Sequence, residues 1–214
     1  RLEGVGSVGE AVDGAAWVVE AVFEDAALKA RLLEEAEAAA REGVVLASNT
    51  SSLSISGLAA GLRRPERFLG MHFFNPVHLM PLLEVVRGER TSPEVVERAR
   101  AFGAALGKEV IVVRDAPGFA TSRLGVCLGM EAIRMVEQGV ASAEDIDKAM
   151  VLGYRHPVGP LRLTDMVGLD VRLAIGEHLA RELGNAAFEP PALLRRMVAE
   201  GRLGKKAGRG FYEW

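Results

Sequence analysis

A histidine and a glutamate in two apolar, strand-like segments are the residues of this chain best suited to chemistry. His72 lies in Gly70-Met-His-Phe-Phe-Asn-Pro76, and Glu84 interrupts an apolar run at residues 82–86. A buried carboxylate is costly without a partner, and an imidazole would satisfy it. Because histidine titrates near neutral pH, the pair could remove the proton of a secondary alcohol. Taken alone, the two residues fit a satisfied core histidine and an edge-strand charge even better, so spacing does not settle their role.

Hydroxyl and amide side chains follow an earlier apolar run, in Ser48-Asn-Thr-Ser-Ser-Leu53. Ligands of open α/β sheets bind beyond the carboxyl ends of the strands, so these groups and His72 are expected to converge on one crevice. A second pattern, Gly4-Val-Gly-Ser-Val-Gly9, has the form of a dinucleotide fingerprint. Too few residues precede it for the required strand, and Asp13-Gly14 would interrupt the following helix. We therefore do not expect these glycines to bind a cofactor phosphate.

Short apolar runs alternate with amphipathic stretches in the first half of the chain, which predicts an α/β unit with a mostly parallel sheet. The expected strands lie at residues 17–22, 44–48, 68–72, 82–86 and 110–113. The expected helices cover 25–40 and the stretch from Thr91-Ser-Pro-Glu94 to about 106. Later periodic stretches, at 118–138, 142–151, 159–182 and 191–201, predict helices only. We therefore expect two domains, 1–115 and 116–214.

The composition narrows the classes of function. Of 214 residues, 49% are hydrophobic and 26% charged, with a net charge of -3 and no apolar run long enough to span a membrane. The acidic balance argues against a nucleic-acid surface, so a small ligand is expected. Cys127 is the single cysteine, which excludes an intrachain disulfide and favours a reducing, cytoplasmic location. We single out no metal-ligating residues.

The motifs around residues 48–53, 70–77 and 83–86 strongly resemble those of the L-3-hydroxyacyl-CoA dehydrogenase family in sequence and spacing. Later segments also resemble that family's helical domain and tail: Asp115-Ala-Pro-Gly-Phe119, Glu144-Asp-Ile-Asp147, Pro157-Val-Gly-Pro160, Asp165-Met-Val-Gly-Leu-Asp170 and Gly204-Lys-Lys-Ala-Gly-Arg-Gly-Phe-Tyr212. The resemblance spans nearly the whole chain. It implies the C-terminal part of a Rossmann-type NAD-binding domain, followed by an all-α domain for substrate binding and dimerisation.

The resemblance also implies an activity, the NAD-dependent oxidation of L-3-hydroxyacyl-CoA to 3-ketoacyl-CoA, in fatty-acid β-oxidation or in short-chain 3-hydroxybutyryl-CoA metabolism. His72 would be the catalytic base, Glu84 its orienting partner and Ser51 the hydroxyl that binds the substrate oxygen. The residues implied in cofactor binding are Glu24, Lys29, Asn49, Ser51 and Lys206. An acyl-CoA substrate and a homodimer formed through the helical domain are expected.

Two departures from the family pattern leave alternatives open. Where the family commonly has an asparagine that binds the substrate thioester carbonyl, Gly118-Phe-Ala-Thr-Ser-Arg123 carries Ser122, whose hydroxyl reaches less far. The family's first βαβ unit, with its glycine fingerprint, also has no expected counterpart before Arg1. One alternative is a relative that acts on sugar acids or serves as a lens crystallin. Another is a catalytically inert fragment whose helical half mainly dimerises.

Overall fold

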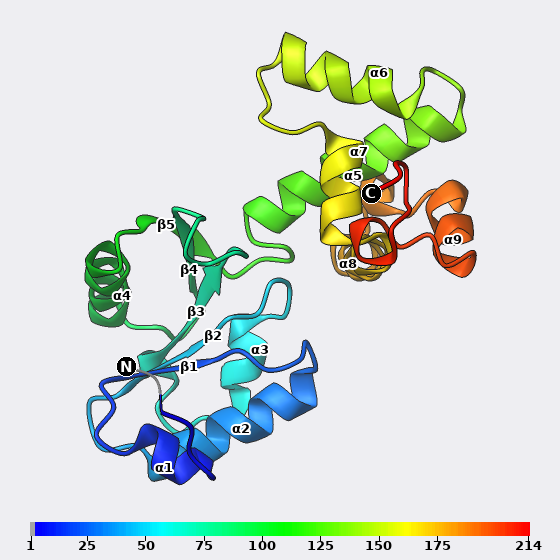
Figure 1. Cartoon of the computed structure of the whole chain (residues 1–214). Coiled ribbons are helices and arrows are strands. Elements are labelled where there is room, and N and C mark those ends of the chain that lie inside the picture. The colour runs from blue at the N-terminus through cyan, green and yellow to red at the C-terminus, as the bar shows by residue number, and fades with distance from the viewer. Residues whose placement is uncertain (1–2) are drawn as a thin grey trace. The chain divides into compact units, whose positions relative to one another are not determined.

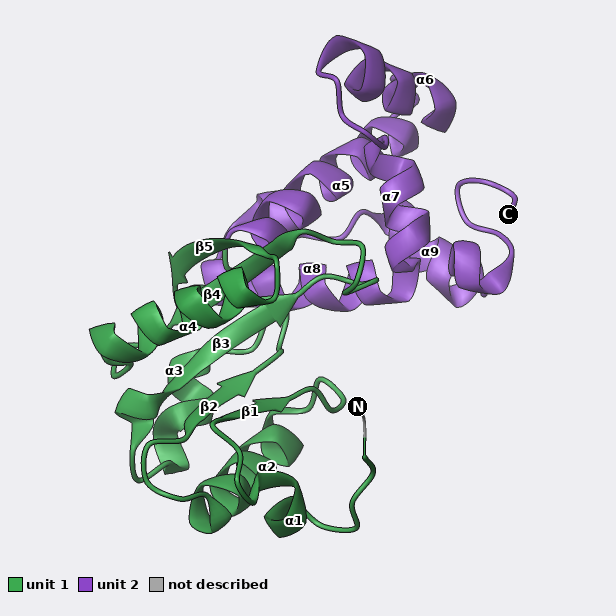
Figure 2. Cartoon of the chain, turned by 60° about the vertical axis from the view of Figure 1, so that its left-hand side comes forward, with its two compact units in different colours: residues 1–119 green, residues 120–214 purple. Residues whose placement is uncertain are grey.

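The computed structural model describes residues 3–214, and the chain divides after Phe119 into two compact units (Figure 2). The first unit contains the strands and ends at Phe119; the second runs from Ala120 to Trp214 and is helical. The α/β unit followed by a helical unit confirms the predicted fold class. Within the described residues, no helix has the length and apolar character needed to cross a membrane.

One five-stranded sheet organises the first unit, and its strands lie in chain order (Figure 1). The strands are β1 (Trp17–Glu20), β2 (Val45–Ser48), β3 (Phe68–Phe73), β4 (Leu82–Arg87) and β5 (Glu109–Arg114). Neighbouring strands pair in parallel except β3 and β4, which are antiparallel. The strands lie where the apolar runs predicted them, and the mostly parallel character is confirmed.

Helices cover both faces of this sheet because its side chains alternate in direction. On one face, Leu46, Phe68 and Val86 pack with α2 (Ala26–Ala39) and α3 (Ile55–Leu58). On the other, the intervening residues of the same strands pack with α4 (Pro93–Ala105); they include Val45, Ala47, Leu69, Met71, Leu83 and Val85. Being apolar on both sides, the strands form continuous apolar runs in the sequence.

The helix starts follow local capping chemistry. Asp25 accepts a hydrogen bond from the backbone N–H of Leu28 at the start of α2, and Ser92 accepts one from Val95 at the start of α4. Before β1, the short α1 (Val8–Val12) begins at the cap residue Ser7 and ends at Asp13, where the sequence predicted an interruption. Residues 1–2 lie outside the described residues, and the whole glycine pattern, Gly4 to Gly9, lies within them.

The helical unit consists of α5 (Thr121–Glu137), α6 (Ala143–Lys148) with a π-helical turn at Ala149–Gly153, α7 (Pro160–Val167), α8 (Leu169–Leu183) and α9 (Ala192–Ala199). The prediction of one helical stretch over 159–182 was wrong in this respect, because two helices meet at Gly168. Its φ of 104° lies in a region that side-chain-bearing residues avoid. Ile133 is buried in this unit's core, whereas Leu124, on the same helix, is exposed.

Two buried carboxylates hold the C-terminal tail on the helical unit. Asp165 accepts hydrogen bonds from the backbone N–H groups of Phe211 and Tyr212 and from Nε1 of Trp214, each at 2.9 Å. Asp147 accepts from the backbone N–H of Leu161 and from the hydroxyl of Tyr212. The tail is therefore a fixed part of this unit.

Candidate active site

The His72 and Glu84 side chains meet because β3 and β4 run antiparallel. The register of this strand pair places the two residues directly opposite each other. Nδ1 of His72 lies 3.0 Å from Oε2 of Glu84, with side-chain exposures of 7% and 0%. Antiparallel neighbours have side chains on the same face and close in space, so the backbone itself aims the imidazole at the carboxylate. Glu84 therefore reaches His72 from within β4.

Aromatic rings surround the imidazole on its other sides. The Phe74 ring lies 4.4 Å from the His72 ring, centroid to centroid, and Phe119 approaches edge-on at 6.0 Å. Among the described residues, the imidazole thus has a polar contact to Glu84 and two aromatic neighbours. With Nδ1 bonded to a carboxylate, the favoured neutral tautomer has its hydrogen on Nδ1 and its lone pair on Nε2. Such an imidazole can accept a proton at Nε2.

Glu24 organises the loop that follows β2. Its Oε1 accepts hydrogen bonds from the Thr50 hydroxyl at 2.5 Å and from the backbone N–H groups of Ser51 and Ser52 at 3.0 and 3.2 Å. The carboxylate itself follows β1 and remains 40% exposed. Glu24 and Ser51, which were both singled out in the sequence, are thus brought together at the carboxyl ends of neighbouring parallel strands.

Asn49 joins the ends of β2 and β3. Its Oδ1 accepts the backbone N–H of Phe73, the residue after His72, at 2.8 Å. The carboxamide oxygen is therefore occupied by the protein, and its NH₂ group remains available as a donor. This contact fixes the distance between the Ser51 loop and the strand that carries the histidine.

Lys29 lies at the centre of a buried polar network. Its ammonium group is only 1% exposed and contacts Glu20 Oε1 at 2.7 Å, the carbonyl of Val22 at 3.0 Å and Glu24 Oε2 at 3.5 Å. The hydroxyl of Ser48 donates to the other oxygen of Glu20 at 2.7 Å. These contacts compensate the charges that burial would otherwise penalise.

Sequence reasoning did not identify Glu20 and Ser48 as parts of this network. The argument used for Glu84 could have found Glu20, because an acid that ends the apolar run Trp17-Val-Val-Glu20 also requires a partner on burial. The partner itself, Lys29, is nine residues later on α2, and only the packing of that helix on the sheet brings the two together.

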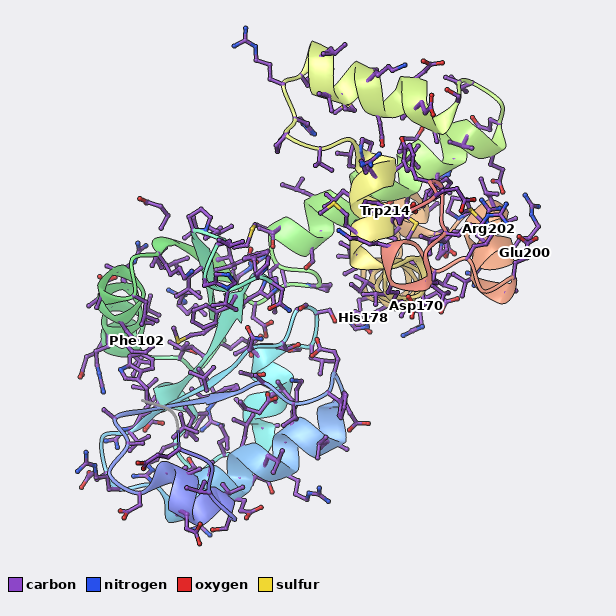
Figure 3. All side chains as sticks on the ribbon, in the orientation of Figure 1. Phe102, Asp170, His178, Glu200, Arg202 and Trp214 are labelled. Atoms are coloured by element: carbon purple, nitrogen blue, oxygen red, sulfur yellow. The ribbon has the colours of Figure 1, made fainter. Side chains whose placement is uncertain are left out.

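The two remaining candidates belong to the helical unit. Ser122 is the second residue of α5 and is half-buried. Lys206, in the 3₁₀ turn Lys205–Ala207 of the tail, binds both oxygens of Asp170, at 2.6 and 2.7 Å. Figure 3 shows Asp170 beside the tail. Burial alone would raise the pKa of Asp170, but the hydrogen bond from Lys206, a backbone N–H and the charge of Lys206 outweigh it and lower the pKa below 3.8.

Comparison with known proteins identifies the family. Residues 1–116 match the family described as 3-hydroxyacyl-CoA dehydrogenase, NAD binding domain, and residues 118–214 match 3-hydroxyacyl-CoA dehydrogenase, C-terminal domain. The chain belongs to the 3-hydroxyacyl-CoA dehydrogenase family. Together the two matches span nearly all of the chain, so its first unit is that family's NAD-binding domain and NAD is its cofactor.

Individual members of the family are similar over most of the chain. A 3-hydroxybutyryl-CoA dehydrogenase of Mycobacterium tuberculosis is 47% identical over 199 residues, which cover 92% of this chain and 70% of the relative. The human mitochondrial hydroxyacyl-coenzyme A dehydrogenase is 45% identical, covering 92% of this chain and 63% of its own length. The crystal structure of (S)-3-hydroxybutyryl-CoA dehydrogenase PaaH1 from Ralstonia eutropha superposes with a TM-score of 0.94 at 43% identity, over 99% of this chain and 75% of that one.

Side chains that fit a nicotinamide cofactor are present in this 3-hydroxyacyl-CoA dehydrogenase. Ligands bind beyond the carboxyl ends of strands in such sheets, and Glu24, Asn49 and Ser51 follow the carboxyl ends of β1 and β2. The exposed carboxylate of Glu24 can accept hydrogen bonds from hydroxyls, and the NH₂ group of Asn49 can donate to a carbonyl oxygen. The donor and acceptor set therefore suits the sugar and amide of a nicotinamide nucleotide.

Proposed function

We propose that this enzyme interconverts L-3-hydroxyacyl-CoA and 3-ketoacyl-CoA, with His72 as the general base and Glu84 as the group that orients it. The observation that carries this proposal is the 3.0 Å contact between His72 Nδ1 and the fully buried Glu84 carboxylate. A buried carboxylate bonded to one ring nitrogen fixes both the orientation and the tautomer of the imidazole. Oxidation of a secondary alcohol requires such a base.

In this mechanism His72 moves one proton, and the fold positions the polar groups of Glu84, Ser51 and Glu24 around the reaction. NAD supplies the acceptor for the hydride that leaves the alcohol carbon. His72 takes the hydroxyl proton at Nε2, and the negative charge of Glu84 stabilises the imidazolium that forms. The Ser51 hydroxyl donates to the substrate oxygen, and the Glu24 contact to the Ser51 backbone N–H keeps that hydroxyl in place. In the reverse direction the imidazolium returns the proton to the carbonyl oxygen.

Lys29 has a supporting role in this proposal. Its ammonium group is enclosed by Glu20, Glu24 and a backbone carbonyl, so it acts on the cofactor mainly by holding Glu24 in place and by partly balancing its charge. Lys206 is proposed to contribute from the tail, where Asp170 orients its ammonium group.

The substrate proposed here is a short-chain acyl-CoA. This follows from the names of the similar proteins in Mycobacterium tuberculosis and Ralstonia eutropha, which are 3-hydroxybutyryl-CoA dehydrogenases. Such a reaction belongs to fatty-acid β-oxidation or to short-chain 3-hydroxybutyryl-CoA metabolism. Because Cys127 is the single cysteine, the chain forms no internal disulfide, and we propose the cytoplasm as its location.

A homodimer formed through the helical unit is also proposed. Several large apolar side chains of that unit are exposed, among them Leu124, Val140, Leu152 and Tyr154, with exposures between 59% and 77%. Exposed apolar side chains in such numbers are typical of a surface that a partner covers. Ile133 takes no part in this surface, because it is buried in the unit's own core.

The decisive experiment is His72→Ala, with acetoacetyl-CoA reduction by NADH as the assay. We expect the rate to fall by about a hundredfold or more, as is typical when a general acid–base residue is removed. His78→Ala is the matched control, since His78 lies exposed in the connection between β3 and β4. A His72→Ala enzyme that melts like the parent and reduces acetoacetyl-CoA at near the parental rate would disprove the assignment.

A further inference from the structure

Arg172 is a buried charge without a compensating partner in the helical unit. It lies in the first turn of α8 and is 5% exposed. Its Nε is fully buried without a hydrogen-bond partner, and none of the ion pairs in the described part of the chain includes its guanidinium. Burial lowers the pKa of Arg172 to about 10, so the group is still charged at neutral pH. A charge held in this way is costly, and a buried, perturbed charge is a candidate for a functional site.

The guanidinium lies along α5, and the glycines of that helix make room for it. A Cβ atom on Gly129 would lie 3.4 Å from Nε of Arg172 and 3.2 Å from the hydroxyl of Thr164. A Cβ atom on Gly125 would lie 3.9 Å from Nη1. From Nε to Nη1, the side chain therefore points from Gly129 toward Gly125, which is toward the N-terminal end of α5.

That direction leads to Ser122. Residues 122, 125 and 129 share one face of the helix, because they are three and four positions apart. Ser122 lies about 4.5 Å along the helix axis from Gly125, at a rise of about 1.5 Å per residue. The half-buried hydroxyl of Ser122 and the tip of Arg172 are thus successive polar groups along one face.

We propose that Arg172 donates hydrogen bonds to an oxygen acceptor on the acyl group of the bound substrate, next to Ser122. This inference rests on the proposed function, because the acceptor belongs to the acyl-CoA. A guanidinium offers several donors in a planar fork and suits both a carbonyl and a carboxylate oxygen. Two sources are possible: the thioester carbonyl, which every acyl-CoA has, or a carboxylate at the far end of the acyl chain.

The test compares Arg172→Met and Arg172→Lys with the parent enzyme on two substrates, acetoacetyl-CoA and 3-ketoadipyl-CoA, which carries a distal carboxylate. Methionine keeps much of the side-chain length and removes the charge. Replacing an unpaired buried charge by an apolar group is expected to leave the melting temperature unchanged or to raise it. Arg181→Met is the matched control, because Arg181 is exposed on the same helix.

We expect Arg172→Met to lower kcat/KM by about tenfold or more on at least one substrate, as is typical for a lost hydrogen bond from a charged group. Lysine should restore part of the loss. A loss on both substrates identifies the thioester carbonyl, and a loss confined to 3-ketoadipyl-CoA identifies the carboxylate. Unchanged kinetics on both substrates would overturn the inference, whether or not the melting temperature falls. Free CoA has no acyl group, so its binding as an inhibitor should not change in Arg172→Met. A weakening of CoA inhibition as large as the loss in kcat/KM would also overturn the inference.

These outcomes separate this inference from the proposed function. If the parent enzyme reduces neither substrate, the proposed function fails before Arg172 is considered. If the parent is active and His72→Ala is not, while Arg172→Met behaves like the parent, only the inference about Arg172 fails.

Discussion

Glu84 lies directly opposite His72 on the neighbouring antiparallel strand, and their side chains meet at 3.0 Å inside the first unit. The partner of the proposed base is therefore part of the sheet itself. A strand residue has little freedom to move, so the imidazole is held before substrate arrives in the orientation that the proposed mechanism requires.

Glu84→Gln should lower kcat strongly and change KM little. The amide keeps the size of the side chain and can still bond to Nδ1, but it lacks the charge that stabilises the imidazolium. We expect a loss of about a hundredfold in the rate of acetoacetyl-CoA reduction, within the range typical for disturbed acid–base catalysis. A rate within twofold of the parent, in a folded protein, would show that the carboxylate is structural only.

Substitutions at Glu20 and Glu24 should have different effects, one mainly on stability and the other mainly on cofactor binding. Glu20→Ala leaves the buried Lys29 without its nearest counterion, which typically costs about 3 kcal/mol and should lower the melting temperature clearly. Glu24→Ala removes a half-exposed carboxylate and releases Ser51, so it should mainly raise KM for NADH. Thermal melts and steady-state kinetics measure the two effects, and a reversed pattern would contradict the assignment of Glu24 to the cofactor.

Ser122→Asn should keep or raise activity on short acyl-CoA substrates. Asparagine reaches further than serine and can donate through its amide to an acceptor that the shorter hydroxyl leaves to a bridging water. The measurement is kcat/KM for acetoacetyl-CoA. A large loss of activity would show that Ser122 does not face the substrate.

The melting temperature of the Asp170→Asn variant should fall less than that of the parent as the pH becomes acidic. The pKa of Asp170 is lower in the folded protein than its ordinary value of 3.8, so its contribution is present above that value and is lost as the pH falls through the folded pKa. Melting temperatures of the parent and the variant should therefore differ at pH 6 and approach each other as the pH falls below 3.8. Since both side chains are partly exposed to solvent, the difference should be small and should shrink in high salt. A constant difference across this range would exclude the Lys206 contact as its source.

Leu152→Glu should weaken self-association if the helical unit forms the dimer. Leu152 is 77% exposed, so the substitution costs little in an isolated subunit but would place a charge in a covered interface. Sedimentation velocity at several concentrations measures the result. Lys148→Glu on the neighbouring exposed turn provides a control for surface charge alone. If the parent protein remains monomeric at high concentration, the proposal of a homodimer is wrong.

The strands and long helices could be predicted because their signals are local. Apolar runs predicted all five strands of the described sheet, and the capping segment that includes Ser92 predicted the start of α4. The break at Gly168 was not predicted, because an apolar period continues across it and the positive φ of this glycine leaves no local pattern in the sequence. The network around Lys29 and the burial of Arg172 also depend on contacts between distant elements, which no local pattern predicts.

The antiparallel pairing of β3 and β4 also restricts how this sequence can change. Successive strand residues face opposite sides of the sheet, so a slip of one residue between these two strands would turn the acid away from the imidazole while leaving the pairing of the backbones nearly as favourable. An insertion in the connecting segment 74–81 therefore preserves the pair only if residue 84 still lies opposite residue 72 in the strand register. In the proposed mechanism, catalysis therefore depends on strand alignment as much as on the identity of the two side chains.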